Sequence, residues 1–293
     1  MEIKIDKEPI DYTLENETTL GEVVRGIENW LDNAGMLIGS MRIDDRELSV
    51  QNRDEWKSLP LETITELDVK TMMVYEAIYE ELQTVELYVQ KLTEAVLAND
   101  TPKIKELKAD FSVVGNYIDK LLKTSNSDQM EELLEKEDEQ SRKIVVQFLD
   151  SIHLLITERI REIEEPIEEL RRLTALLEKT NNDLREVSLL LQTGKDKEAM
   201  DLVITFTELS QKLLRILQLG KQQKVIDSAS LTVNGTDITG FYNELNSFFS
   251  ELQEAFESKD SVLIGDIFEY EVAPRIDDLL AVLKRYTGGD SVS

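Results

Sequence analysis

Hydrophobic residues change their spacing close to residue 72. In residues 1–71 they alternate with polar residues, whereas from Met72 onward they recur every three or four positions. Alternation is the pattern of a half-buried β-strand, and the wider spacing is that of an amphipathic helix. The sequence therefore predicts an α+β protein with a small N-terminal domain, residues 1–71, followed by an elongated all-α body of antiparallel helix bundles.

The N-terminal residues predict strands on both sides of one main helix. Ile3 and Ile5 alternate with charged residues and a second alternation begins after Pro9, so the chain is expected to start with a β-hairpin. Thr19 with Glu22 three residues later is a capping box, which predicts the start of a helix. The second hairpin strand holds Ile10, Tyr12 and Leu14, the helix buries Leu20, Val23, Val24, Ile27, Trp30 and Leu31, and strands over 36–43, 48–50 and 67–69 follow with turns at Asp44-Asp45 and 52–56.

This order of two strands, a helix, two strands, a helical turn and a last strand resembles the ubiquitin-like β-grasp superfamily. Modifiers and sulfur carriers of that superfamily end their domain with a free Gly-Gly, whose carboxylate is activated. Here Lys70-Thr71 runs directly into the next helix, and Gly288-Gly289 lies far away in an expected flexible tail, residues 287–293. The resemblance therefore implies a docking domain without the carboxylate chemistry.

One seven-residue spacing organises the helical body. An apolar residue occupies every seventh position at Leu149, Ile156, Ile163, Leu170, Leu177, Leu184 and Leu191. This predicts a central helix that begins near Ser127, is roughly 65 Å long over the seam alone, and is kinked at Pro166. Two bundles, residues 72–158 and 159–286, would share it, with helices over 72–98, 102–123, 199–219, 241–256 and 261–286 and a tight turn at Asn234-Gly235.

Two sets of residues are candidates for contact with another protein. The second half of the seam is half polar, because Thr174, Asn181 and Ser188 face its leucines, and this favours either a homodimer contact or a cover provided by the chain's own hairpin. Phe248, Phe268 and Tyr270 fall off the apolar stripe of the last hairpin, so they are candidates for a partner groove, with burial in the core as the alternative. The interaction residues predicted from the first set are Leu177, Asn181 and Leu184.

Composition and motifs disfavour most kinds of chemistry. The net charge of −27 argues against nucleic acid or an anionic membrane as a direct partner, and the lack of cysteine excludes disulfides and thiolate sites. His153 is the single histidine, so the Asp150-x-x-His153 pair lacks the second histidine of a di-iron bundle and is read as part of the seam. The acidic run Glu162, Glu164, Glu165, Glu168 and Glu169 is expected to face mostly water, and no glycine-rich phosphate motif occurs.

These observations predict a non-enzymatic cytoplasmic interaction or scaffold protein, without cofactor or metal. It would dock protein partners through the β-grasp-like domain or a bundle face, and could form a homodimer. The alternative is a helical ligand- or metal-binding protein with its site in the C-terminal hairpin.

Overall fold

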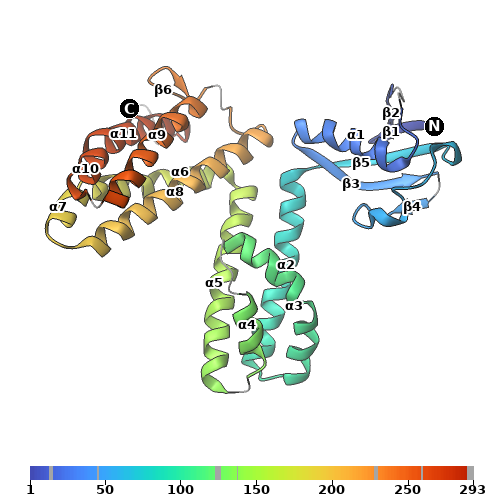
Figure 1. Ribbon diagram of the computed structural model, residues 1–293, viewed down its shortest axis with the longest axis horizontal. Helices are drawn as coiled ribbons and strands as arrows, with labels where there is room; N and C mark the ends of the chain where they lie inside the picture. Colours follow the sequence, from blue (N-terminus) through green and yellow to red (C-terminus); the bar gives the residue numbers. More distant parts are fainter. Residues whose placement is uncertain are drawn as a thin grey trace. The chain divides into compact units, whose positions relative to one another are not determined.

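The computed structural model describes residues 1–12, 16–44, 46–122, 127–136, 138–227, 230–258 and 260–288. It divides into two compact units, Met1–Thr157 and Glu158–Ser293. The first unit begins with a mixed β-sheet and continues with helices, and the second is helical apart from one short hairpin (Figure 1). The expected α+β class, a small N-terminal sheet domain followed by a helical body, is confirmed.

The N-terminal sheet has five strands in the order β2-β1-β5-β3-β4. They are β1 (Glu2–Ile5), β2 (Glu8–Pro9), β3 (Met36–Ile43), β4 (Arg46–Leu48) and β5 (Glu66–Met73). Strands β1 and β5 are parallel, with Ile3 opposite Leu67, and the other neighbours are antiparallel. Strand β2 is shorter than the alternation predicts, whereas β5 is longer and continues to Met73. Leu14 and Asp45 lie outside the described residues.

Helix α1 (Leu20–Asn33) packs its apolar side on this sheet. It begins where expected, since the Glu22 carboxylate accepts a hydrogen bond of 3.0 Å from the backbone N–H of Thr19. Short 3₁₀ turns, Arg53–Glu55 and Leu61–Thr63, close the domain. Trp30 departs from the predicted stripe and is 59% exposed. The core consists of Ile3, Ile5, Leu20, Val23, Val24, Ile27, Leu31, Ile38, Met41, Ile43, Leu48, Trp56, Leu61, Ile64, Leu67 and Val69.

Four helices follow the sheet: α2 (Val74–Leu97), α3 (Thr101–Leu122), α4 (Ser127–Leu134) and α5 (Glu139–Glu164). The expected uninterrupted helix from Ser127 is wrong, because α4 ends at Leu134. Asp138 begins the next helix: its carboxylate accepts hydrogen bonds from the backbone N–H and the hydroxyl of Ser141, at 2.8 and 2.6 Å. An Asp in this capping position satisfies N–H groups that have no partner inside the helix.

The predicted central helix is also interrupted at Pro166. Glu165 leaves the helical conformation, with φ −133° and ψ 55°, and Pro166 is the first residue of α6 (Pro166–Leu184), which is followed by α7 (Val187–Gln192). Proline disfavours the helical conformation in the residue before it and fits the first position of a new helix. The break replaces the expected kink, so the seven-residue seam is divided among three helices. The helix that the two units share is α5, which is continuous across their boundary.

The second unit packs α6 between two later helices. Its elements are α8 (Asp196–Gln222), β6 (Thr232–Val233), β7 (Thr236–Asp237), α9 (Ile238–Ser258), α10 (Ser261–Asp266), a π-helical segment (Ile267–Val272) and α11 (Ala273–Tyr286). Helix α6 contacts both α8 and α11. The predicted turn at Asn234-Gly235 is confirmed, with φ values of 52° and 83°.

Two features near the C-terminus differ from expectation. The helix predicted over 261–286 contains the π-helical segment just before Pro274, whose missing N–H disturbs the regular hydrogen-bond ladder. The predicted tail is wrong at its first residue, because Thr287 is buried and its carbonyl accepts a 2.9 Å hydrogen bond from Arg171. Residues 289–293 lie outside the described residues. None of the described helices has the length and apolar character needed to cross a membrane.

Candidate functional site

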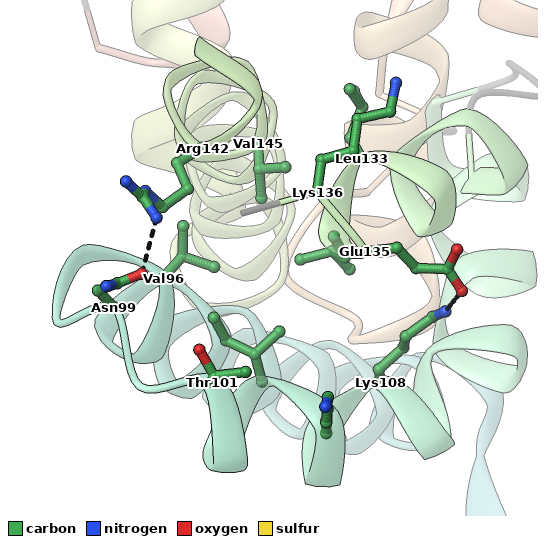
Figure 2. A pocket seen from close by; sticks show the side chains of 12 residues that line it. Val96, Asn99, Thr101, Lys108, Leu133, Glu135, Lys136, Arg142 and Val145 are labelled. Atoms are coloured by element: carbon green, nitrogen blue, oxygen red, sulfur yellow. Dashed lines mark hydrogen bonds and ion pairs between the residues drawn. The ribbon is translucent and has the colours of Figure 1, made fainter. Parts of the chain in front are cut away.

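A pocket of about 340 Å³ lies in the first unit where the ends of four helices meet. It is enclosed by the end of α2 and the turn after it, the first turns of α3, the end of α4 with the residues that follow, and the first turns of α5 (Figure 2). Its lining residues are Val96, Asn99, Thr101, Ile104, Lys105, Lys108, Leu133, Leu134, Glu135, Lys136, Arg142 and Val145.

The turn between α2 and α3 fixes one side of this pocket. Asn99 adopts a left-handed conformation with φ 54°, which asparagine tolerates better than most residues. The Asp100 side chain then accepts a 3.0 Å hydrogen bond from the N–H of Lys103 and caps α3. Arg142 at the start of α5 donates a 2.7 Å hydrogen bond to Asn99 Oδ1, which ties α5 to the turn (Figure 2).

The charge of the pocket is opposite to that of the whole chain. Among the residues that the structure describes, four cations line it, Lys105, Lys108, Lys136 and Arg142, against one carboxylate, Glu135. The chain as a whole has a net charge of −27. Because acidic residues outnumber basic ones in this chain, a local excess of positive charge arises only where several basic residues lie close together.

Only part of this positive charge is compensated by ion pairs. The Lys108 ammonium hydrogen-bonds the Glu135 carboxylate (Figure 2) and lies 3.7 Å from Glu131. The hydrogen bond between Lys108 and Glu135 raises the pKa of Lys108 and lowers the pKa of Glu135. Lys105 and Lys136 form no ion pair with any residue that the structure describes.

The floor of the pocket is aliphatic. Val96 and Val145 are 3% and 1% exposed, and Ile104, Leu133 and Leu134 are half-buried around them. Cations beside an apolar floor suit a ligand that is both acidic and apolar. Within the described ranges, no group of three or more His, Asp or Glu residues could hold a metal ion.

A second hollow, on the N-terminal sheet, has a smaller excess of positive charge. Its described lining contains four cations, Lys4, Lys7, Arg42 and Lys70, and three carboxylates, Glu47, Glu66 and Asp68. Lys4 pairs with Glu66 at 2.6 Å and Arg42 with Asp68 at 3.0 Å. Because three carboxylates offset most of the charge of its four cations, this hollow should attract an acidic ligand less strongly than the pocket between the helices.

The candidate residues on α6 are inside the second unit. Leu177, Asn181 and Leu184 are 1%, 0% and 0% exposed. Asn181 Nδ2 donates hydrogen bonds of 3.0 Å to the carbonyl of Ala273 and 2.8 Å to Asp277 Oδ1, both on α11. The chain's own helices therefore cover the half-polar seam, as in the alternative considered above. Its assignment to a dimer contact is wrong, whereas homodimerisation through another surface stays a prediction.

The three off-stripe aromatic residues do not share one environment. Phe268 is 0% exposed and belongs to the core, Phe248 is half-buried with the Arg275 guanidinium 4.5 Å from its ring centre, and Tyr270 is 63% exposed. The partner groove predicted from them is wrong for Phe268, which is inaccessible. Phe241, Tyr242, Leu245 and Leu252 are buried, as their helical spacing predicts.

His153 is half-buried on α5. Its side chain is 43% exposed, and Nδ1 is 3.6 Å from Glu86 on α2. Asp150 on the same helix is exposed. The histidine thus faces a single carboxylate of a neighbouring helix.

The acidic run around Pro166 contains two buried members, contrary to expectation. Glu162 and Glu169 are 1% and 2% exposed. Lys212 on α8 donates hydrogen bonds of 2.6 Å to Glu158 and 3.1 Å to Glu169. The spacing of the apolar residues, which alone assigned the faces of this helix, does not reveal that these glutamates are buried. The available signal was Lys212 and its neighbour Arg215 in an otherwise apolar stretch of α8.

Glu162 is the most perturbed carboxylate of this cluster. Arg215 binds it through two hydrogen bonds of 3.1 and 3.2 Å, and Arg159 adds one of 3.1 Å. Burial raises the pKa of Glu162 to about 7, against the opposing attraction of Arg159 and Lys212. Since both oxygens are occupied by arginines of the same chain, we read this cluster as a structural joint between α5, α6 and α8.

The cationic pocket was not predicted from the sequence either. Its basic residues are separated along the chain by up to 37 positions, from Lys105 to Arg142, and none of them forms a recognisable motif. The only available signal was that basic residues gather around the predicted helix ends of an acidic chain.

Comparison with known proteins gives partial matches. Residues 1–73 match the family model of the TP0873 N-terminal domain, and residues 168–282 match a domain of unknown function, DUF8042. An uncharacterized protein of Treponema pallidum (strain Nichols) is 29% identical over 110 residues, which is 38% of this chain and 54% of that protein. The match thus spans about half the length of the relative. No solved structure matches. The two family matches cover the N-terminal domain and most of the second unit. The pocket residues, which lie between positions 96 and 145, fall outside both matches.

Proposed function

We propose that this chain is a non-enzymatic, cytoplasmic interaction protein that binds a protein partner at the cationic pocket between α2, α3, α4 and α5. The observation that carries the proposal is the convergence of Lys105, Lys108, Lys136 and Arg142 over an aliphatic floor. A convergent set of polar groups on an apolar surface is the usual composition of a ligand site. The same residues include no nucleophile paired with a base, which favours binding over catalysis.

Electrostatics supports a specific role for this pocket. A chain with a net charge of −27 repels most acidic molecules from its surface, so an acidic partner is attracted only where basic residues converge. Such a pocket orients the acidic partner as well as binding it, because the surrounding acidic surface repels the partner elsewhere. The cytoplasmic location is compatible with a chain that contains no cysteine.

We further infer that the N-terminal domain is a β-grasp domain that serves in docking. Three features support this: the strand order β2-β1-β5-β3-β4, the parallel pairing of β1 with β5, and a single helix, α1, packed on the sheet. A docking role predicts that the isolated domain binds a protein that the intact chain binds outside the cationic pocket.

The proposed function is tested by charge reversal in the pocket. The double variant Lys105→Glu with Lys136→Glu changes two pocket residues, and Lys91→Glu with Lys120→Glu makes the same charge change at exposed residues of α2 and α3 that do not line the pocket. Tagged chains recovered from cytoplasmic extracts of the native cells should bring down a protein with the wild type and the control, and lose it with the pocket variant. Identical co-purifying proteins for all three would contradict the proposal.

A further inference from the structure

We propose that the occupant of the cationic pocket is a short acidic peptide segment of the partner protein, which places an aliphatic side chain on the pocket floor. This inference rests on the proposed function and specifies the chemistry of the partner. It follows from the floor, the rim and the size of the pocket.

The floor selects an aliphatic group. Val96 and Val145 form its buried base, and Ile104 and Leu134 extend it toward the surface. None of these four side chains carries a polar atom, so a polar group placed on them would lose its hydrogen bonds to water without replacement. A leucine, isoleucine or valine side chain has no hydrogen bonds to water to lose there, and burial of its apolar surface is favourable.

The rim selects carboxylates. Lys105 on α3 and Lys136 after α4 make no ion pair with the described residues, so each can bind an added anionic group. The nearest capping carboxylates are already engaged, because Asp100 accepts from Lys103 and Asp138 from Ser141. Hydrogen bonds from Ser141 also lower the pKa of Asp138, because they stabilise its ionised form.

The arrangement of these groups fits a peptide. Arg142 with Asn99 lies at one side of the pocket and Lys108 with Glu135 at the other, with the aliphatic residues between them (Figure 2). A helical acidic peptide can repeat this order, since positions i, i+4 and i+8 follow one another on one helix face and can carry a carboxylate, an aliphatic side chain and a second carboxylate. The volume of about 340 Å³ is at the lower end of the range of about 300–1,000 Å³ for ligand sites, which suits a few side chains.

A nucleic acid fits this site less well. Its phosphates continue in both directions beyond any short contact, and each additional phosphate would approach the acidic surface of a chain with net charge −27. A short peptide carries few charges, and all of them can lie within the pocket. The peptide therefore gains the attraction of the pocket without the repulsion of the surroundings.

The test measures binding of a labelled synthetic peptide in which glutamates flank two leucines, by fluorescence anisotropy with the full-length chain. Two matched peptides replace the glutamates with glutamines or the leucines with serines. We expect saturable binding of the first peptide at about 50 mM salt, and clearly weaker binding of both matched peptides. Lys105→Glu with Lys136→Glu should weaken the affinity by about tenfold, whereas Lys91→Glu with Lys120→Glu should leave it unchanged. Circular dichroism would show that all variants remain folded, and Lys105→Gln with Lys136→Gln should give an intermediate loss.

Three results would overturn this inference. The first is equal binding of the acidic peptide to wild type and pocket variant, and the second is no preference for leucine over serine. The third is saturation by octanoate or inorganic phosphate without any binding of the peptide, which would assign the site to a small anion. If co-purification depends on the pocket but the peptide does not bind, the peptide chemistry is wrong and the proposed function stands. If the peptide binds as expected but no cellular protein depends on the pocket, the inference is supported and the proposed function fails.

Discussion

Glu162 shows how a single charged residue can be buried at a helix junction. Removing a carboxylate from water costs several kcal/mol, which attraction to neighbouring cations offsets only if their geometry is good. Arg215 and Arg159 supply three hydrogen bonds of 3.1 to 3.2 Å to it. Glu169 differs: burial disfavours its charge, but hydrogen bonds from Lys212 and Arg172 prevail and lower the pKa of Glu169. The pKa of Glu162 is thus raised and the pKa of Glu169 is lowered, although the two residues are only seven positions apart.

The raised pKa of Glu162 predicts a pH-dependent effect of Glu162→Gln. Below its unfolded pKa of 4.5 the native state is fully stabilised by the proton on Glu162, and this contribution is lost as the pH rises through about 7. The free energy of unfolding of the wild type relative to the variant should therefore fall by about 1–3 kcal/mol between about pH 5 and about pH 8. Urea denaturation at a series of pH values measures this difference. A flat profile would mean that the arginines keep Glu162 ionised throughout.

Leu177 provides a second prediction at this scale. Leu177→Ala should lower the free energy of unfolding by about 2–5 kcal/mol, because the side chain is 1% exposed and its loss leaves a cavity among α6, α8 and α11. Leu176→Ala is the matched control on the same helix: Leu176 is 50% exposed, so the change should stay within about 0.5 kcal/mol. The mass from light scattering should be the same for both variants and the wild type. A lower mass for Leu177→Ala with unchanged stability would restore the intermolecular interpretation.

At the scale of elements, the sequence predicted most helices and strands but placed their interruptions poorly. Leucine spacing carried the phase of the seam correctly across Pro166, but spacing cannot report that Glu165 leaves the helix, because the same residues stay in register on either side. The break before Asp138 could have been found, since its capping bond to Ser141 is a local signal. The partners of Glu162 and the walls of the pocket come from helices distant in sequence, and no local pattern brings those together.

The N-terminal domain gives a prediction at this same scale. Residues 1–73 should fold alone and melt cooperatively, because their core is a separate hydrophobic cluster and all five strands end by Met73. A fragment that ends at Thr71 is the informative control. It removes the pairing of Met36 with Met73 and of Leu37 with Met72, so its melting temperature should be lower. Absence of a cooperative transition in the 1–73 fragment, seen by circular dichroism, would show that the domain needs the helical body.

At the scale of the whole molecule, the basic residues include some that pair with carboxylates of the chain and some that make no such pair. The excess of 60 acidic over 33 basic residues leaves few cations to distribute. Lys212 and Arg215 are used internally, where they neutralise buried carboxylates. Lys105 and Lys136 are not used in this way among the described residues, although a self-repelling chain would gain stability by pairing them. In the proposed function, these two cations are the ones that remain available to bind an acidic group of a partner.

The division of the chain into two units has a consequence for its resistance to proteases. The boundary, between Thr157 and Glu158, falls inside α5, which is helical from Glu139 to Glu164. Proteases cut segments that can adopt an extended conformation, and domain boundaries are usually such segments. Here the backbone must first unwind several turns of helix before cleavage. Limited proteolysis of the native chain therefore has no easily cleaved segment at this boundary, and a fragment comprising the second unit alone has to be produced by recombinant expression.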